Sequence, residues 1–176
     1  LADKSLITQN IDGLDGKAGN RNYIPIHGRL DKVTLFHDQG INVSLIEAPW
    51  EEVAILSETN NNDNHLKKLL LDAFKISSKS LVPQLGKSYK PFVLLFDEYY
   101  TDLYRMAEAE YWMKSTNKFV FIGTSFSVNI TSIALQYALK NNCKIEIVDP
   151  KPIDIGVPSV VYHQMTANEF ILMNSI

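Results

Sequence analysis

Apolar and polar positions along the second half of the chain predict strands and helices in alternation. Short apolar runs at 92–96 and 119–122, and the isoleucine- and valine-containing segment 144–148, have the length of strands. Segments 101–114 and 130–140 place apolar residues three and four positions apart, the spacing of a helix with one buried face. A short strand at 160–162 precedes Thr166 and Glu169, whose spacing predicts a capping box and a terminal helix. This alternation favours an α/β fold, a Rossmann-like parallel sheet with flanking helices.

The first half of the chain has a different pattern. Residues 6–8 have the pattern of a strand, whereas 31–90 predicts a small inserted subdomain or lid. Within that insert, 57–65 is a polar run and apolar residues from Leu66 to Phe74 recur at helical spacing. The 176 residues fit one domain, and because Leu1 is not an initiator Met and lies just before a strand, we expect this domain to be incomplete at its N-terminus.

Composition narrows the compartment and the partners. Lys+Arg 17 against Asp+Glu 20 gives a net charge of −3, which offers no broad basic surface for nucleic acid. The lone Cys143 excludes an intramolecular disulfide and a multi-cysteine zinc site, and it favours an intracellular, most simply cytoplasmic, protein. No apolar run approaches the roughly 20 residues that cross a bilayer, so no membrane association is expected.

The strongest local signal for chemistry is the segment from Thr8 to Leu14. Gln9, Asn10 and Asp12 follow a strand, at the sheet edge where open α/β folds bind ligands. Amide and carboxylate groups there suit ribose hydroxyls or a carboxamide. The alternative, an Asx-rich turn that leaves the strand, is about equally supported by these residues alone.

A second candidate is His27, which lies in the apolar stretch 24–28 and precedes a glycine. A neutral imidazole there would serve as a general base near physiological pH. The alternative is a hydrogen-bonded core histidine, which is the commoner situation for a lone His in an apolar run.

A third candidate is the turn Gly123, Thr124 and Ser125 between a predicted strand and helix. Backbone amides at such a turn can face a ligand oxygen, but a plain βα turn with Ser127 or Asn129 as the helix cap is the alternative. A remote alternative is a serine hydrolase in which Ser125 is the nucleophile, followed by Asp149 and His163. The glycines between 13 and 19 lack dinucleotide-binding spacing and favour a flexible loop.

In combination these segments resemble the sirtuins, the NAD-dependent protein-lysine deacylases. Five blocks occur in family order over about four fifths of the chain, namely 8–14 with 18–19, 26–28, 90–98, 123–128 and 147–149. The resemblance implies release of nicotinamide and O-acyl-ADP-ribose. It implies that His27 is the general base and that Gln9, Asn10 and Asp12 bind the nicotinamide ribose and carboxamide, with Asn10 also catalytic. It further implies that Gly123, Thr124, Ser125 and Asp149 bind the adenosine half, and that Phe96 and Glu98 lie beside an acyl-lysine peptide.

Three departures from the family pattern modify these expectations. Segment 31–90 contains no cysteine, so the family's zinc ribbon is expected to be absent and its place taken by apolar packing. The family's glycine-rich pyrophosphate loop precedes the first matched block and is missing here. Asp97 stands where the family has glycine, and Asp149 stands where it usually has asparagine. Protein ADP-ribosyl transfer and a non-catalytic module that binds NAD or ADP-ribose therefore remain as alternative functions.

Overall fold

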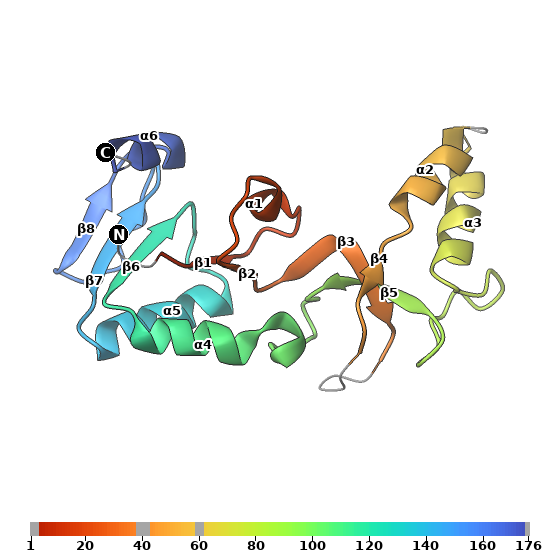
Figure 1. The fold of residues 1–176 in the computed structure, drawn as a ribbon, viewed down its shortest axis with the longest axis horizontal. Coiled ribbons are helices and arrows are strands. Elements are labelled where there is room, and N and C mark those ends of the chain that lie inside the picture. Colours follow the sequence, from red (N-terminus) through yellow and green to blue (C-terminus); the bar gives the residue numbers. More distant parts are fainter. Residues whose placement is uncertain (1–3, 38–42, 59–61, 175–176) are drawn as a thin grey trace. The chain divides into compact units, whose positions relative to one another are not determined.

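The computed structural model describes residues 4–37, 43–58 and 62–174, and the chain divides into two compact units, Leu1–Ala109 and Glu110–Ile176. The elements of the first unit are β1 (Leu6–Thr8), α1 (Leu14–Lys17), β2 (Tyr23–Pro25), β3 (Gly28–Leu35), β4 (Ile46–Glu47), α2 (Trp50–Glu58), α3 (Asp63–Ala73) and β5 (Tyr89–Val93) (Figure 1). A 3-10 turn (Asp102–Tyr104) follows, and α4 (Met106–Ser115) spans the boundary between the units. The second unit continues with β6 (Lys118–Ile122), α5 (Asn129–Lys140), β7 (Lys144–Val148), β8 (Val160–His163) and α6 (Ala167–Met173).

The second unit contains a parallel sheet in the order β6-β7-β8. Phe121, Ile145 and Ile147 are buried in its core beside Ala138 of α5, because alternate side chains of each strand face the helix. The expected α/β architecture with parallel strands is confirmed here, including the bounds of β7 and the helix that follows β6. The capping box that begins α6 is also present, with Thr166 and Glu169 as its two members.

The first unit contains a parallel pair, β1 with β2, and an antiparallel sheet in the order β4-β3-β5. The prediction that 92–96 is a buried strand of the parallel sheet is wrong, since β5 ends at Val93 and pairs antiparallel with β3. Leu95 is 50% exposed and Phe96 is fully exposed in the loop that follows. An apolar run indicates a strand but not its partner or its direction, which the position of β3 decides here.

Other boundaries differ from the expected ones for local reasons. The helix predicted from 101 to 114 is interrupted at Arg105, whose φ of 58° is left-handed, and regular α-helix begins only at Met106. The N-cap of α5 is Val128, not Ser127 or Asn129. The glycine-rich stretch expected to be a loop contains the single turn α1.

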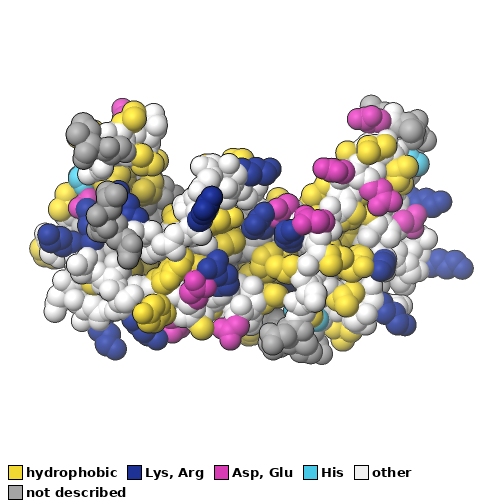
Figure 2. All heavy atoms as spheres, viewed as in Figure 1, with side chains coloured by type: hydrophobic (Ala, Val, Ile, Leu, Met, Phe, Trp, Pro, Cys, Tyr) yellow, Lys and Arg dark blue, Asp and Glu magenta, His cyan; other side chains and the backbone are white. Residues whose placement is uncertain are grey.

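The antiparallel sheet carries the hairpin of α2 and α3, which lie side by side (Figure 1). The polar pattern did not predict α2, whereas the helix predicted near Leu66–Phe74 is α3 and begins three residues earlier. Val53 and Phe74 are buried where the hairpin meets the sheet, and the Trp50 and Phe74 rings lie 5.5 Å apart. Other apolar side chains of the hairpin remain exposed among charged ones, as Figure 2 shows.

Within the described residues, no helix combines the length and the apolar character needed to cross a bilayer.

Candidate functional site

Three segments of the first unit meet around His27 through backbone hydrogen bonds. Ile26 donates its N–H to the Thr8 carbonyl at 3.0 Å, and Leu30 donates to the Ile11 carbonyl at 2.8 Å. On the other side, Leu94 donates to the carbonyl of His27 itself at 2.9 Å. The structure therefore brings His27 together with the 9–12 segment, and it adds the loop after β5 to the same region.

His27 lies in the turn between β2 and β3, not within a strand, and its side chain is half-buried. Its Nε2 lies 2.8 Å from the hydroxyl of Tyr100, and the two rings are stacked with centroids 5.9 Å apart. Burial lowers the pKa of the imidazole below its ordinary value, and a hydrogen bond with the backbone of Gln9 acts in the opposite direction. The ring is therefore neutral near pH 7, which is the state that a general base requires.

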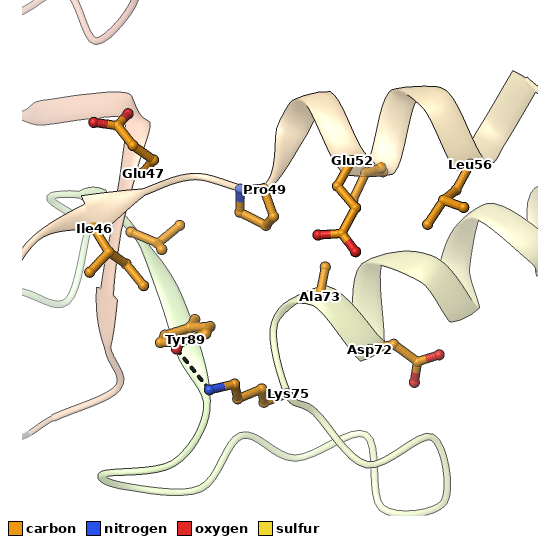
Figure 3. A pocket seen from close by; sticks show the side chains of 11 residues that line it. Ile46, Glu47, Pro49, Glu52, Leu56, Asp72, Ala73, Lys75 and Tyr89 are labelled. Atoms are coloured by element: carbon orange, nitrogen blue, oxygen red, sulfur yellow. Dashed lines mark hydrogen bonds between the residues drawn. The ribbon is translucent and has the colours of Figure 1, made fainter.

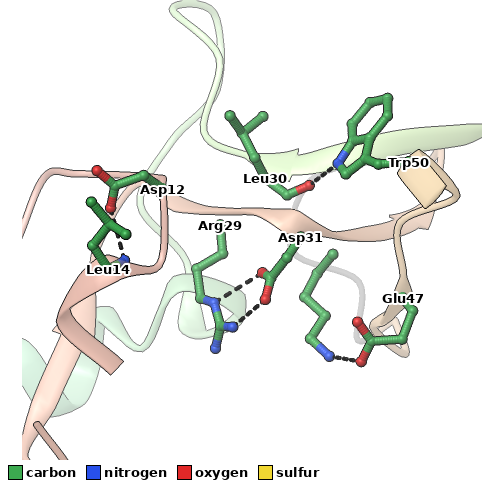
Figure 4. A network of polar contacts seen from close by, with 8 residues as sticks. Asp12, Leu14, Arg29, Leu30, Asp31, Glu47 and Trp50 are labelled. Atoms are coloured by element: carbon green, nitrogen blue, oxygen red, sulfur yellow. Dashed lines mark hydrogen bonds and ion pairs between the residues drawn. The ribbon is translucent and has the colours of Figure 1, made fainter. Parts of the chain in front are cut away.

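The polar residues after β1 differ in how far their side chains are already engaged. Asn10 is exposed, and its backbone N–H donates to the Thr8 hydroxyl at 3.2 Å. The Asp12 side chain accepts the N–H of Leu14 at 2.9 Å (Figure 4). Asp12 therefore forms the Asx turn that was the alternative interpretation of this segment. Gln9 is half-buried, and its backbone contacts the His27 ring.

An ion pair on β3 lies next to the segment that follows β1. Arg29 donates from Nε to Asp31 at 2.9 Å, and its guanidinium lies next to Gly13 (Figure 4). Farther along the same strand, Lys32 pairs with Glu47 of β4. Sequence patterns gave no signal for the Arg29–Asp31 pair, because two charged residues at a spacing of two occur on many exposed strands.

Phe96 and Glu98 have different environments in the loop after β5. Phe96 is fully exposed. Glu98 forms an ion pair with Lys90, and it also accepts the backbone N–H of Leu95 at 2.9 Å. Burial raises the Glu98 pKa, but the Leu95 N–H and the Lys90 ammonium outweigh it and hold the pKa below its ordinary value. Glu98 therefore shapes the loop as an ionised side chain.

In the second unit, the predicted adenosine-binding residues lie at the carboxyl ends of β6 and β7. Gly123, with φ of 60°, donates its N–H to the Val148 carbonyl at 3.0 Å, which places it next to the strand end that Asp149 follows. Asp149 accepts the Lys151 N–H at 2.8 Å, and Thr124 accepts the Phe126 N–H at 3.3 Å. Neighbouring parallel strand ends of this kind are where α/β sheets bind ligands.

The contacts of Ser125 and His163 do not support the serine hydrolase alternative. The Ser125 hydroxyl lies 2.6 Å from the Ser127 hydroxyl, and His163 Nε2 lies 3.2 Å from the carboxylate of Glu146. A nucleophilic serine needs the imidazole as its hydrogen-bond partner, and here each group has a different one.

The first unit also contains a cavity of about 400 Å³ between the antiparallel sheet and the α2–α3 hairpin (Figure 3). Its walls are mainly apolar, with Glu52 and Asp72 on the helices and Lys75 bonded to Tyr89 at 2.7 Å. None of the sequence-predicted site residues lines it. In the part of the chain that the structure describes, no three His, Cys, Asp or Glu side chains are grouped as a metal ion would require.

Tyr100 is the site residue that sequence reasoning missed. It lies 73 positions from His27, in a loop with no periodic pattern, and no motif connects the two residues. The only available signal was that 94–100 follows a strand and is rich in aromatic residues.

Known proteins resemble this chain in sequence. A family model described as the Sir2 family matches residues 2–130. An NAD-dependent protein deacylase of Bacteroides thetaiotaomicron is 25% identical over 150 residues, which cover 85% of this chain and 53% of that protein. The NAD-dependent deacetylase sir2E of Dictyostelium discoideum is 29% identical over 145 residues, 80% of this chain and 40% of that protein.

Solved structures of Sir2 enzymes share the fold. One, at 25% identity, superposes with a TM-score of 0.62 over 94% of this chain and 58% of the other. A Sir2 homologue in complex with ADP ribose, at 20% identity, gives a TM-score of 0.63 over 96% of this chain and 57% of the other. The chain spans about half the length of the curated relatives it matches. Because the family model covers most of the chain, this protein belongs to the Sir2 family, the sirtuins.

Proposed function

We propose that this chain is part of an NAD-dependent protein-lysine deacylase. The observation that carries the proposal is the half-buried, neutral His27, held beside the strand-end residues Gln9 to Asp12. Membership of the Sir2 family and the names of the relatives, a deacylase and a deacetylase, support it.

The residues of the first unit fit the ribose half of NAD. The exposed amide of Asn10 and the carboxylate of Asp12 can bond to hydroxyl and carboxamide groups, while His27 offers an imidazole lone pair. When bound, NAD would supply a ribose carbon from which neutral nicotinamide departs. In this proposal, Asn10 and Asp12 orient the sugar, the surrounding apolar residues exclude water, and His27 Nε2 accepts a hydroxyl proton.

The second unit fits the adenosine half. At Gly123, positive φ and open space around the position leave the backbone accessible to a ligand. Asp149 follows the neighbouring strand end, where a carboxylate can accept hydrogen bonds from two ribose hydroxyls. The same carboxylate would repel a 2′-phosphate, which favours NAD over its phosphorylated form. Thr124 and Ser125 supply hydroxyls at the same turn.

We further propose that the protein substrate presents an acyl-lysine along the loop after β5. The exposed Leu95 and Phe96 offer apolar contact there, and the ionised Glu98 holds the loop in shape. Segment 31–90, which contains the helical hairpin and most of the antiparallel sheet, is proposed to be the inserted small subdomain. The lone Cys143 favours an intracellular location.

The test measures nicotinamide released from NAD in the presence of acetyl-, succinyl- and longer acyl-lysine peptides, with the full-length protein that contains this chain. We expect release that depends on the peptide, and we expect His27→Ala to lower kcat by at least about 100-fold, because general-base catalysis contributes that much. His37→Ala is the matched control, since His37 bonds to the Leu35 carbonyl of the small subdomain, and it should retain activity.

The pH dependence of kcat/KM is a second readout. Because the pKa of His27 is lowered, the imidazole becomes protonated only at a pH below its ordinary pKa of 6.5. Activity should therefore be independent of pH around pH 7 and should fall only at a pH below 6.5. Absence of nicotinamide release with every acyl group would overturn the deacylase proposal. Transfer of labelled ADP-ribose to protein would instead identify the ADP-ribosyltransferase alternative.

A further inference from the structure

Tyr100 makes two contacts with the ring of His27. Its hydroxyl lies 2.8 Å from Nε2, and its ring stacks on the imidazole with an interplanar angle of 20°. Both side chains are partly buried, so water competes little for the hydrogen bond. A hydrogen bond of this length, together with the ring contact, favours one orientation of the imidazole.

The protonation state of the ring follows from the role that the proposed function gives it. A general base that accepts a proton at Nε2 must hold its lone pair on that nitrogen, so the neutral ring carries its proton on Nδ1. The Tyr100 hydroxyl, 2.8 Å from Nε2, is then the donor of the hydrogen bond.

The loop that carries Tyr100 is held by hydrogen bonds at two positions before Tyr100, namely Leu94 and Glu98. Leu94 bonds to the backbone of His27, so the start of the loop is tied to the same residue that Tyr100 contacts. Farther along, the carboxylate of Glu98 pairs with the buried Lys90 and is 3.4 Å from the Tyr104 hydroxyl. These anchors hold the loop on either side of its exposed tip and limit where Tyr100 can lie.

We propose that Tyr100 is a positioning residue for His27, whose hydroxyl controls the lone pair on Nε2. The contact itself is independent of any activity. Its catalytic meaning rests on the proposed function, in which the substrate hydroxyl replaces the Tyr100 hydroxyl at this lone pair and then transfers its proton to it. The hydrogen bond and the ring contact with Tyr100 together orient the imidazole.

The test compares the reactivity of His27 toward diethyl pyrocarbonate in the wild-type chain and in Tyr100→Phe. The neutral Nε2 lone pair attacks a carbonyl carbon of the reagent and expels ethyl carbonate, and the rate at each histidine is read by peptide mass spectrometry. Removal of one hydrogen bond to this lone pair should raise the His27 rate about fivefold. Tyr99→Phe is the matched control, and it should leave the His27 rate unchanged. His37 is the internal reference, and its own rate should be the same in every sample.

Equal His27 rates in the wild type and in Tyr100→Phe, at matched urea midpoints, would overturn the proposal. A measurement on the wild type alone keeps the test valid if the variant folds poorly. A two-bond ¹H–¹⁵N spectrum should place the neutral ring's proton on Nδ1, and a proton on Nε2 would contradict the proposal.

Nicotinamide release in the same variants separates this proposal from the proposed function. We expect Tyr100→Phe to lower kcat about tenfold with little change in the KM for NAD, because ring orientation affects proton transfer more than binding. If no variant, wild type included, releases nicotinamide while the reactivity contrast persists, the proposed function fails and the positioning role stands.

Discussion

Gly28, the residue after His27, is a position where the backbone accepts only glycine. Its φ of 82° is left-handed, and a Cβ there would overlap the backbone carbonyl oxygen of Phe92. Close approach of β3 and β5 thus requires glycine at the start of β3. The glycine of the His-Gly pair therefore has a packing reason, which is independent of the role proposed for His27.

At this scale we predict that Gly28→Ala lowers the free energy of unfolding by roughly 3 kcal/mol or more, because backbone strain and a steric overlap add. Gly86→Ala is the matched control: its φ is also positive, at 67°, but the space around it is open. That variant should lose about 1 kcal/mol. Urea unfolding measures both, and equal losses would contradict the role assigned to the β3–β5 contact.

At the scale of elements, the loop after β5 depends on the Lys90–Glu98 ion pair. The side chains of Lys90 and Glu98 are only 8% and 16% exposed. Since the pKa of Glu98 in the folded protein is below its ordinary value, the pair contributes stability above that value, and this contribution is lost as the pH falls through the folded pKa.

We predict that Glu98→Gln lowers the free energy of unfolding by roughly 2 kcal/mol at pH 7, since the Lys90 ammonium then lacks its buried partner. The difference from the wild type should shrink as the pH falls through the lowered pKa of the folded protein, because the wild-type carboxylate is then itself protonated. Urea unfolding at several pH values measures this. Glu108→Gln, which removes an exposed i,i+3 pair with Arg105, should cost under about 1 kcal/mol, and a pH-independent Glu98→Gln difference would argue against the pair.

At the scale of the whole molecule, the candidate residues divide between the two units. His27 and the 9–12 segment belong to the first unit, whereas Gly123 and Asp149 belong to the second. Because the proposed base and the proposed adenosine site lie on separately packed cores, we expect substitutions in the two units to affect different kinetic steps.

We predict that Asp149→Ala weakens binding of ADP-ribose about tenfold, as expected for loss of hydrogen bonds to a charged group, and raises the KM for NAD with little effect on kcat. Asp149→Asn should retain most of the affinity, because an amide oxygen still accepts a ribose hydroxyl. Isothermal titration calorimetry with ADP-ribose measures binding. Unchanged affinity in Asp149→Ala would remove this residue from the proposed site.

The sequence by itself determined the elements that local signals specify. The bounds of β7 follow from a short segment with Ile145, Ile147 and Val148 that Asp149 and Pro150 end, and the start of α6 follows from its capping box. The order of the five motif blocks predicted the family, which the family model confirms. Each of these signals lies within a few neighbouring residues, so no knowledge of packing was needed.

Tertiary structure alone decided what depends on distant segments. The antiparallel pairing of β5 with β3, the Lys90–Glu98 pair that shapes the following loop and the Tyr100 contact with His27 join residues through space. Hydrophobic periodicity specifies which side of an element is buried but not which element covers it. The neighbours of the candidate base could therefore be identified only once the chain was folded.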